Sequence, residues 1–502
     1  MSLIAKLDEM RQSGGAARTA GLADAEVTRL AAKYPELAAA IDDAYALHQS
    51  LRTEMPDLIA LDENAQLARV QGDFINFYPE DAINPYVALA ARGPWVVTLK
   101  GAVIHDSGGY GMLGFGHTPK PILDALARPQ VMANVMTPSV SQLRFTRALA
   151  AEIGHRRGGS PFKHFLCLNS GSESVSLACR IADVNAKLMT EPGARHAGRT
   201  IKRVAVKGAF HGRTERPAVY SDSSRKAYVQ HLASFRDERS LLTVEPYNLD
   251  QLRSIFADAD RNGWFIEAMF LEPVMGEGDP GRAATPAFYA AAREVTKAHG
   301  ALFLVDSIQA GLRAHGVLSV VDYPGFETLD APDMETYSKA INGGQYPLSV
   351  LAVSDRAATL YKKGIYGNTM STNPRALDVA CAALTQLTPE LRANIRQRGA
   401  EFIERLEKLK AELPGLITKV QGTGLLFSCE LAAQFKCYGH GSTEEWMRER
   451  GFGVIHGGTN SLRFTPHFAI TSDEVDLLID GVRQALLHGP RMNVEAPKAA
   501  AA

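Results

Sequence analysis

The stretch Asp333–Pro347, "DMETYSKAINGGQYP", holds a single lysine, Lys339, between a strand-like run and a pair of glycines. Its neighbours are small or apolar, and neither adjacent residue is a carboxylate that could neutralise the charge. A lysine at the end of a strand often only extends its ammonium group into water. The composition and motifs of the rest of the chain decide whether Lys339 has a chemical role instead.

The composition is that of an ordinary globular protein. The 502 residues are enough for more than one domain, and 46% of them are hydrophobic while 22% are charged. Lys and Arg number 54 against 55 Asp and Glu, so no net charge attracts the chain to a polyanion or an anionic membrane. We therefore expect neither nucleic acid nor a membrane as a partner.

Cysteine usage and hydrophobic runs predict a cytoplasmic location. The cysteines are odd in number, scattered and without a CxxC pair, which favours free thiols in a reducing compartment. They are Cys167, Cys179, Cys381, Cys429 and Cys437. The first residues, "MSLIAKLDEMRQSGG", lack the apolar core of a signal peptide, and no apolar run is long enough to cross a bilayer. The histidines show no ligand spacing, so we predict no metal site.

Hydrophobic periodicity divides the chain into four parts. Residues 1–92 form a predicted helical N-terminal extension, with apolar residues three and four apart. Residues 93–388 alternate short apolar runs with helical patterns, which predicts a large α/β domain with a mostly parallel central sheet flanked by helices. Residues 389–490 suggest a small α+β domain, and residues 491–502 a disordered tail.

Ligands bind at the carboxyl ends of the strands in an open parallel sheet. Gly171 and Ser172 follow one predicted strand and open a helix, whose free N–H groups suit a phosphate, although Ser172 could simply cap the helix. Other predicted strand ends carry an aromatic ring, carboxylates, an amide and the lysine. These residues are Phe210, His211, Glu277, Asp306, Gln309 and Lys339. A pyridoxal cofactor needs a lysine that forms a Schiff base and a carboxylate that keeps its pyridine nitrogen protonated.

Six motifs give the chain a family resemblance. It resembles the class III aminotransferases, which are pyridoxal 5'-phosphate enzymes of fold type I, over roughly residues 95–487. The motifs stand in the family's order: "NSGSES", "FHGRT", "EPVMGEGD", "DSIQAGLRAHG", "PDMETYSKAINGGQYPLS" and "GNTMSTNP". The resemblance implies pyridoxal 5'-phosphate as cofactor.

The resemblance also assigns roles around the cofactor ring. Lys339 is expected to form the Schiff base and then to carry the substrate proton. Asp306 would pair with the pyridine nitrogen, and Gln309 would lie near the phenolic oxygen. Phe210 would stack on the ring, and His211 belongs to the same cofactor-binding set.

The remaining cofactor contacts concern the phosphate. Gly171 and Ser172 would donate to it from the start of their helix. Thr369 is expected to reach the phosphate bound by a partner subunit. The resemblance therefore implies a homodimer, or a dimer of dimers, with active sites shared between subunits.

Glu277 and Arg463 are the predicted substrate-binding residues. In family members that accept ω-amines, a glutamate at the position of Glu277 pairs with an arginine of the small domain, which Arg463 in "SLRFTPHFAIT" matches. The arginine is released when a substrate carboxylate must be bound, and its planar guanidinium suits that group. A static ion pair at a domain boundary is the alternative.

Several positions depart from the family pattern. Ser307 stands where the family has a glutamate, Met275 where it has a glutamine, and Ser176 where a glutamate is usual. The arginine of the family's "GFGRTG" has no aligned counterpart, because Ala314 takes its place. The cofactor-holding residues persist while their neighbours differ.

The sequence thus predicts an aminotransferase with a ping-pong mechanism. An amine or ω-amino acid would donate the amino group, and a 2-oxo acid or aldehyde would accept it. The same fold and cofactor also serve racemases, epimerases, aminomutases and decarboxylases, because a fold does not fix a reaction. A non-catalytic protein that keeps a degenerate pyridoxal fold is a further alternative.

Overall fold

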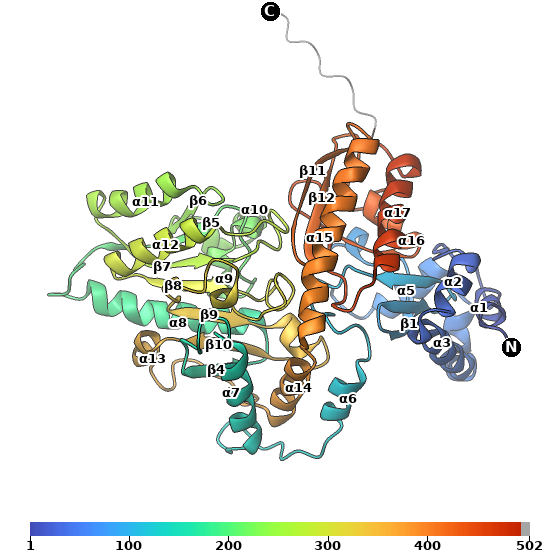
Figure 1. Ribbon diagram of the computed structural model, residues 1–502, viewed down its shortest axis with the longest axis horizontal. Helices are drawn as coiled ribbons and strands as arrows, with labels where there is room; N and C mark the ends of the chain where they lie inside the picture. The colour runs from blue at the N-terminus through green and yellow to red at the C-terminus, as the bar shows by residue number, and fades with distance from the viewer. Residues whose placement is uncertain (493–502) are drawn as a thin grey trace, which may run out of the picture. The chain divides into compact units, whose positions relative to one another are not determined.

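The computed structural model describes residues 1–492, which form two compact units. The sheet unit comprises residues 120–396 and 422–426. The terminal unit comprises residues 1–119, residues 397–421 and the chain from residue 427 onward. The ribbon in Figure 1 follows the chain from blue at the N-terminus to red at the C-terminus. The predicted tail, residues 491–502, lies almost entirely outside the described residues.

A seven-stranded sheet forms the centre of the sheet unit, with the strand order β4-β10-β9-β8-β7-β5-β6. The strands are β4 His164–Leu168, β5 Thr200–Val206, β6 Leu241–Val244, β7 Trp264–Leu271, β8 Leu302–Asp306, β9 Met334–Tyr337 and β10 Ser349–Val353. Strand β10 runs antiparallel to both of its neighbours, and the pairs from β9 to β6 are parallel. The predicted α/β fold with a mostly parallel central sheet is confirmed.

Helices cover both faces of this sheet. Alternate residues of β8 show the two sides: Leu302 and Leu304 pack in one core cluster with α8, while the ring of Phe303 lies 5.3 Å from that of Tyr289 on α12. Asp306, the last residue of β8, lies on the same face of the strand as Leu302 and Leu304, which is the face that α8 covers. The helices of this unit are α6 Lys120–Leu126, α7 Val140–Glu152, α8 Gly171–Thr190, α9 Glu215–Tyr220, α10 Arg225–His231, α11 Leu249–Arg261, α12 Pro286–His299, α13 Asp355–Leu360 and α14 Pro374–Thr385.

Local sequence signals explain where these helices begin and end. In α12, the Thr285 side chain accepts a hydrogen bond from the Phe288 N–H, and Pro286 takes the first helical position. The helix ends at Gly300, whose φ of 82° suits a residue without a Cβ. These signals place the start of β8 two residues further on, at Leu302.

The terminal unit contains two four-stranded sheets, β1-β2-β3-β13 and β11-β12-β15-β14. The strands are β1 Ala88–Arg92, β2 Trp95–Thr98, β3 Val103–Asp106, β11 Ile417–Thr423, β12 Leu426–Leu431, β13 Phe452–Gly453, β14 Ile455–Gly457 and β15 Ser461–Phe464. The helices are α1 Leu3–Arg11, α2 Asp24–Ala31, α3 Pro35–Glu54, α4 Pro56–Ala60, α5 Glu63–Gln71, α16 Thr443–Glu449, α17 Ser472–His488 and most of α15 Pro389–Glu412. Since β13 pairs with β3, the two ends of the chain build one unit.

A buried lysine ties the N-terminal helices to the strands of the terminal unit. The Lys100 ammonium donates to the carbonyl oxygens of Ser13, Gly15 and Leu61 at 2.7 to 2.9 Å. All three donor positions of the ammonium are thus used, which fits a side chain that is 1% exposed. No helix of residues 1–492 has the length and apolar character needed to span a bilayer.

The carboxylate of Glu335, on β9, lies in the core of the sheet unit. It accepts hydrogen bonds from the hydroxyls of Ser307 and Ser319 and from the Val320 N–H. Burial raises the pKa of Glu335 to about 7, although these hydrogen bonds favour the ionised form. Ser307 stands at a position where the family has a glutamate. In this chain, Glu335 on the neighbouring strand β9 brings a carboxylate to Ser307.

Glu335→Gln should change how stability depends on pH. Because the pKa of Glu335 is raised on folding, its favourable contribution is complete below about pH 4.5 and is lost as the pH rises through 7. Between pH 5 and 7.5, we expect the free energy of unfolding of the variant to rise relative to that of the wild type by up to about 3 kcal/mol. Urea unfolding of cofactor-free protein measures this difference.

The exposed Glu390 provides the matched control. The pKa of Glu390 lies below its usual value, chiefly through a backbone hydrogen bond, so it is not raised into the neutral range as that of Glu335 is. Glu390→Gln should therefore leave the pH dependence unchanged. A constant difference between Glu335→Gln and the wild type over the same window would contradict the assignment.

Candidate active site

The N-terminus of α8 is capped by Ser170, and the expectation that Ser172 could be the cap is wrong. The Ser170 hydroxyl accepts from the Glu173 N–H, and the Glu173 carboxylate accepts from the N–H groups of Asn169 and Ser170. This capping box fixes the start of the helix. Gly171 and Ser172 occupy the first turn, where backbone N–H groups have no partner within a helix and can bind an anion.

Two glycines allow the loops at the strand ends to pack closely. A Cβ on Gly171 would lie 2.7 Å from Cδ1 of Ile308, which follows β8. A Cβ on Gly212 would lie 2.6 Å from Oγ of Ser172, and the φ of Gly212 is 107°. The start of α8 is therefore adjacent to the loops after β5 and β8. Side chains at either position would fill this space.

Asp306 and His211 form a buried pair at the end of β8. Oδ2 of Asp306 lies 2.9 Å from Nδ1 of His211, and Oδ1 accepts from the Ile308 N–H at 3.2 Å. The two side chains are 4% and 0% exposed. A buried carboxylate is costly unless it is paired and hydrogen-bonded, and Asp306 has both kinds of partner.

Phe210 and Gln309, the other predicted ring contacts, lie in the same group of loops. The half-buried Phe210 is next to His211, and the Arg213 guanidinium lies 5.0 Å from the centroid of its ring. The buried Gln309 packs against the backbone of Gly276, where a Cβ would be 2.2 Å from its side-chain amide carbon. The loop after β7 thus meets the loop after β8.

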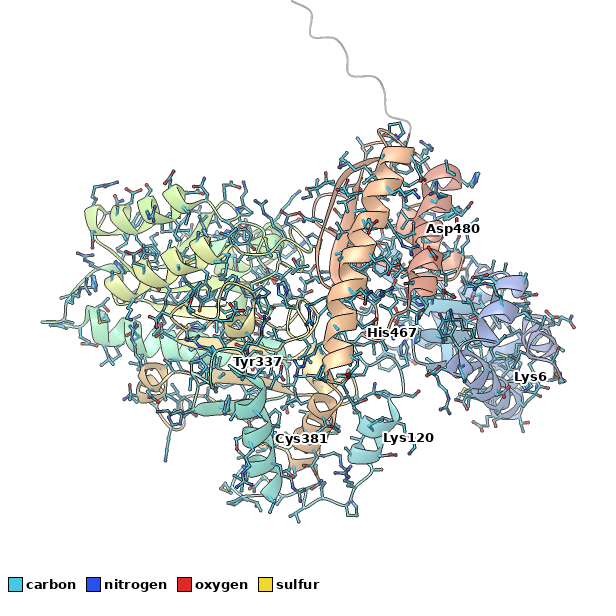
Figure 2. All side chains as sticks on the ribbon, viewed as in Figure 1. Lys6, Lys120, Tyr337, Cys381, His467 and Asp480 are labelled. Carbon is cyan, nitrogen blue, oxygen red and sulfur yellow. The ribbon has the colours of Figure 1, made fainter. Side chains whose placement is uncertain are left out.

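Lys339 has an unusual backbone conformation. It follows the buried Tyr337 and Ser338 at the end of β9 and begins a short 3-10 turn, Lys339–Asn342 (Figure 2 labels Tyr337). Its φ is 49°, in the left-handed region that residues with a Cβ seldom adopt. Such strain is of order 1 kcal/mol and is common at functional positions. The half-buried side chain leaves the sheet at the same edge as Asp306.

Thr369 is exposed, in the loop before α14. The neighbouring Asn368 hydrogen-bonds the Asn169 amide and donates to the Glu173 carboxylate, at 3.2 and 3.1 Å. The carbonyl of Thr369 accepts from the Val135 N–H. This loop is therefore anchored at the start of α8, while the Thr369 side chain faces solvent in the single chain.

The two predicted substrate residues belong to different units. Glu277 is half-buried in the loop after β7, in the sheet unit. Arg463 is fully buried on β15, in the terminal unit, where its guanidinium lies 4.9 Å from the centroid of the Tyr110 ring. A cation over an aromatic face gains a favourable electrostatic interaction with the ring. The pairing of Glu277 with Arg463 stays a prediction.

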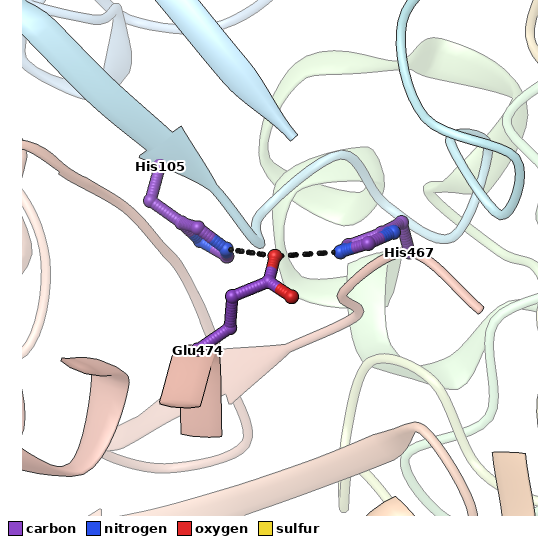
Figure 3. Close-up of side chains that lie close together, drawn as sticks. All are labelled: His105, His467 and Glu474. Carbon is purple, nitrogen blue, oxygen red and sulfur yellow. Dashed lines mark hydrogen bonds and ion pairs between the residues drawn. The ribbon is translucent and has the colours of Figure 1, made fainter. Parts of the chain in front are cut away.

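The structure also brings together a cluster that sequence reasoning missed. Oε1 of Glu474, on α17, lies 3.2 Å from Nε2 of His105 and 2.8 Å from Nε2 of His467, as Figure 3 shows. Burial alone would raise the pKa of Glu474, but the two histidines hold it well below its usual range. His105 precedes Glu474 by 369 residues, so no local spacing could reveal the whole cluster.

Two histidines and a glutamate can bind a metal ion, and in this structure hydrogen bonds join the three side chains. The carboxylate oxygen lies between the two ring nitrogens, where it accepts from both (Figure 3). Its second oxygen accepts from the N–H and hydroxyl of Thr471, in the capping box of α17. The cluster therefore connects β3, the segment after β15 and α17 within the terminal unit.

Comparison with known proteins agrees with this arrangement. The profile of the family described as aminotransferase class-III matches residues 77–486. Succinylornithine transaminase of Citrobacter koseri is 31% identical over 321 residues, covering 63% of this chain and 72% of that protein. The ornithine aminotransferase of Toxoplasma gondii superposes with a TM-score of 0.71 at 21% identity, over 87% of this chain and 98% of its own.

A second structural relative has a similar match. The acetylornithine aminotransferase of Elizabethkingia anophelis gives a TM-score of 0.67 at 23% identity, over 85% of this chain and 99% of its own. At such identities the structural likeness shows the fold, and the profile match shows the family. The chain belongs to the class-III aminotransferases. It is a pyridoxal 5'-phosphate-dependent aminotransferase.

The residues of the sheet unit fit this cofactor. The first turn of α8 offers N–H donors of the kind that bind a phosphate, and Gly171 and Gly212 allow the loops after β5 and β8 to pack close to it. Asp306 is a buried carboxylate, and such a group can keep a pyridine nitrogen protonated. When bound, the cofactor supplies an electron sink that stabilises a carbanion at the substrate carbon.

Proposed function

We propose that this aminotransferase takes an amino group from a donor with a terminal primary amine and passes it to a 2-oxo acid. The observation that carries the proposal is the buried Asp306–His211 pair, which shares the carboxyl edge of the sheet with the start of α8 and with Lys339. A donor and an acceptor that use one site in turn give ping-pong kinetics.

Lys339 has two roles in this proposal. Its amine would hold the cofactor through the cofactor's aldehyde, and as a free amine it would move a proton at the substrate carbon. A lysine can do this only when part of it is uncharged near neutral pH, which a desolvated position favours. Its half-buried place at the end of β9 supports the assignment.

The other residues act on binding and orientation. Asp306, oriented by the His211 imidazole, would hold the proton on the ring nitrogen of the cofactor. Phe210 would lie against the ring face and Gln309 beside the phenolic oxygen. Gly171 and Ser172 would donate their backbone N–H groups to the phosphate.

The substrate class rests on the relatives and on Arg463. The matched relatives are named transaminases of succinylornithine, ornithine and acetylornithine, and this supports a donor whose reacting amine is at the end of an aliphatic chain. Arg463 would bind the carboxylate of the 2-oxo acid, since a guanidinium makes two parallel hydrogen bonds with that group. Glu277 would pair with Arg463 while the donor is bound.

A dimer with shared active sites completes the proposal. Apolar side chains are exposed on the segment before and at the start of α7 and on the Thr369 loop: Val131, Met132, Val135, Met136, Val140, Leu143 and Met370. The two segments are joined by the hydrogen bond from Val135 to Thr369. Contiguous exposed apolar surface of this kind marks an interface. A partner seated there would bring its own site toward Thr369.

Lys339→Ala tests the chemistry. Borohydride reduces the C=N bond between the cofactor aldehyde and a lysine, so peptide mass mapping of treated wild-type protein should place the cofactor on Lys339. The variant should carry no such label and should lose turnover by several orders of magnitude. Lys226→Ala, at an exposed lysine of α10, should behave as the wild type. A label on another lysine in the wild type would refute the assignment.

Met136→Glu combined with Val140→Glu tests the dimer. Sedimentation equilibrium should show a dimer for the wild type and a monomer for the variant, because burying two carboxylates in an interface is costly. A glutamate at Val140 is favourable for α7 itself, since it stands at the first position of the helix. Leu188→Glu, at an exposed leucine of α8, should stay dimeric. A monomeric wild type, or a dimeric double variant, would contradict the proposal.

A further inference from the structure

One buried carboxylate joins two loops of the candidate active site. Glu272 directly follows β7 and is 3% exposed. Its Oε2 accepts from the Phe210 N–H and its Oε1 from the Gly276 N–H, both at 3.0 Å. Because β5 and β7 are adjacent and parallel, the loops that follow them meet at one edge of the sheet. Each oxygen of the carboxylate therefore fixes the backbone of a different loop.

One loop carries a residue expected to contact the cofactor, and the other packs against such a residue. The first carries Phe210 itself, whose ring would stack on the pyridine ring. The second carries Gly276, and Gln309 packs directly on that glycine. A shift of either backbone would move a side chain at the ring. Neither bond lies within a strand pair or a helix, so their loss changes the loops rather than the sheet.

The electrostatic surroundings of Glu272 reinforce this link. Burial raises its pKa to about 7, while His211 favours and Asp306 disfavours its ionised form. The phenol of Tyr247, in the loop after β6, also interacts electrostatically with Glu272. Ionised Glu272 can accept from both N–H groups with its two oxygens. In the protonated acid, one of these oxygens carries the proton and becomes an O–H donor. Glu272 thus belongs to the same charge cluster as the Asp306–His211 pair.

We propose that Glu272 is a positioning residue that sets the placement of Phe210 and Gln309 against the cofactor ring by holding the backbones of Phe210 and Gly276 together. This inference rests on the proposed function, because Phe210 and Gln309 act only as contacts of the cofactor. Glu272 itself touches neither the cofactor nor the substrate in this role. A glutamine could accept only one of the two bonds, since its second terminal atom is a donor.

Glu272→Gln in the holoenzyme tests the role. Two readouts report on the site: the visible circular dichroism per bound cofactor, and the rate at which the cofactor leaves after dilution. We expect the dichroism to fall at least about twofold and release to become about tenfold faster, as the loss of one hydrogen bond to a charged acceptor would produce. Unchanged values for both readouts would overturn the proposal.

Glu267→Gln is the matched control. Glu267 lies on β7 five residues earlier and is also fully buried, but it binds the Tyr220 hydroxyl and the Arg203 guanidinium instead of the site loops. Its substitution should lower the stability of the fold and leave the dichroism per bound cofactor as in the wild type. Equal losses of dichroism in both variants would show a general structural effect and overturn the proposal.

A second variant keeps the charge but shortens the side chain. Glu272→Asp cannot reach both N–H groups, so its cofactor should leave at a rate between those of the wild type and Glu272→Gln. Wild-type behaviour of Glu272→Asp in both readouts would also overturn the proposal. Borohydride labelling of Lys339 should persist in every Glu272 variant. Failure of the Glu272 assignment with that label intact leaves the proposed function standing.

Discussion

The candidate site depends on a carboxylate that is buried inside the protein and hydrogen-bonded from two loops. Asp306 is almost fully buried at the end of β8, where an unpaired charge would be very unfavourable. The His211 imidazole and the Ile308 N–H compensate it from the loops after β5 and β8. Both loops also pack against the start of α8, where Gly171 and Gly212 allow the close approach.

The parallel order of the strands explains why so many functional groups share one edge. Strands β5, β7, β8 and β9 run in the same direction, so the residues that follow them all leave the sheet at the same side. Glu272 directly follows β7, Asp306 is the last residue of β8, and Phe210 and Lys339 lie in the loops after β5 and β9. The buried carboxylate of Glu335 reaches the position next to Asp306 from β9, so the chain keeps an acid there although Ser307 replaces the family's glutamate.

Much of this arrangement could be predicted from the sequence, because the strands of the sheet unit are short apolar runs and the motif residues directly follow them. The reversed direction of β10 could not, since an apolar run carries no sign of its direction. The pairing of β3 with β13 joins segments from opposite ends of the chain, and the His105–Glu474–His467 cluster depends on such long-range contacts. The role of Ser170 as the cap of α8 was signalled by Glu173 three residues later.

The account depends most directly on the proposed pairing of Asp306 with the ring nitrogen of the bound cofactor. Nitrogen-15 NMR of the holoenzyme, reconstituted with pyridoxal 5'-phosphate labelled at the ring nitrogen, reports whether that nitrogen carries a proton. The account predicts a protonated ring nitrogen across the neutral pH range, and loss of that proton when Asp306 is replaced by alanine. An unprotonated ring nitrogen in the wild-type holoenzyme at neutral pH would contradict it.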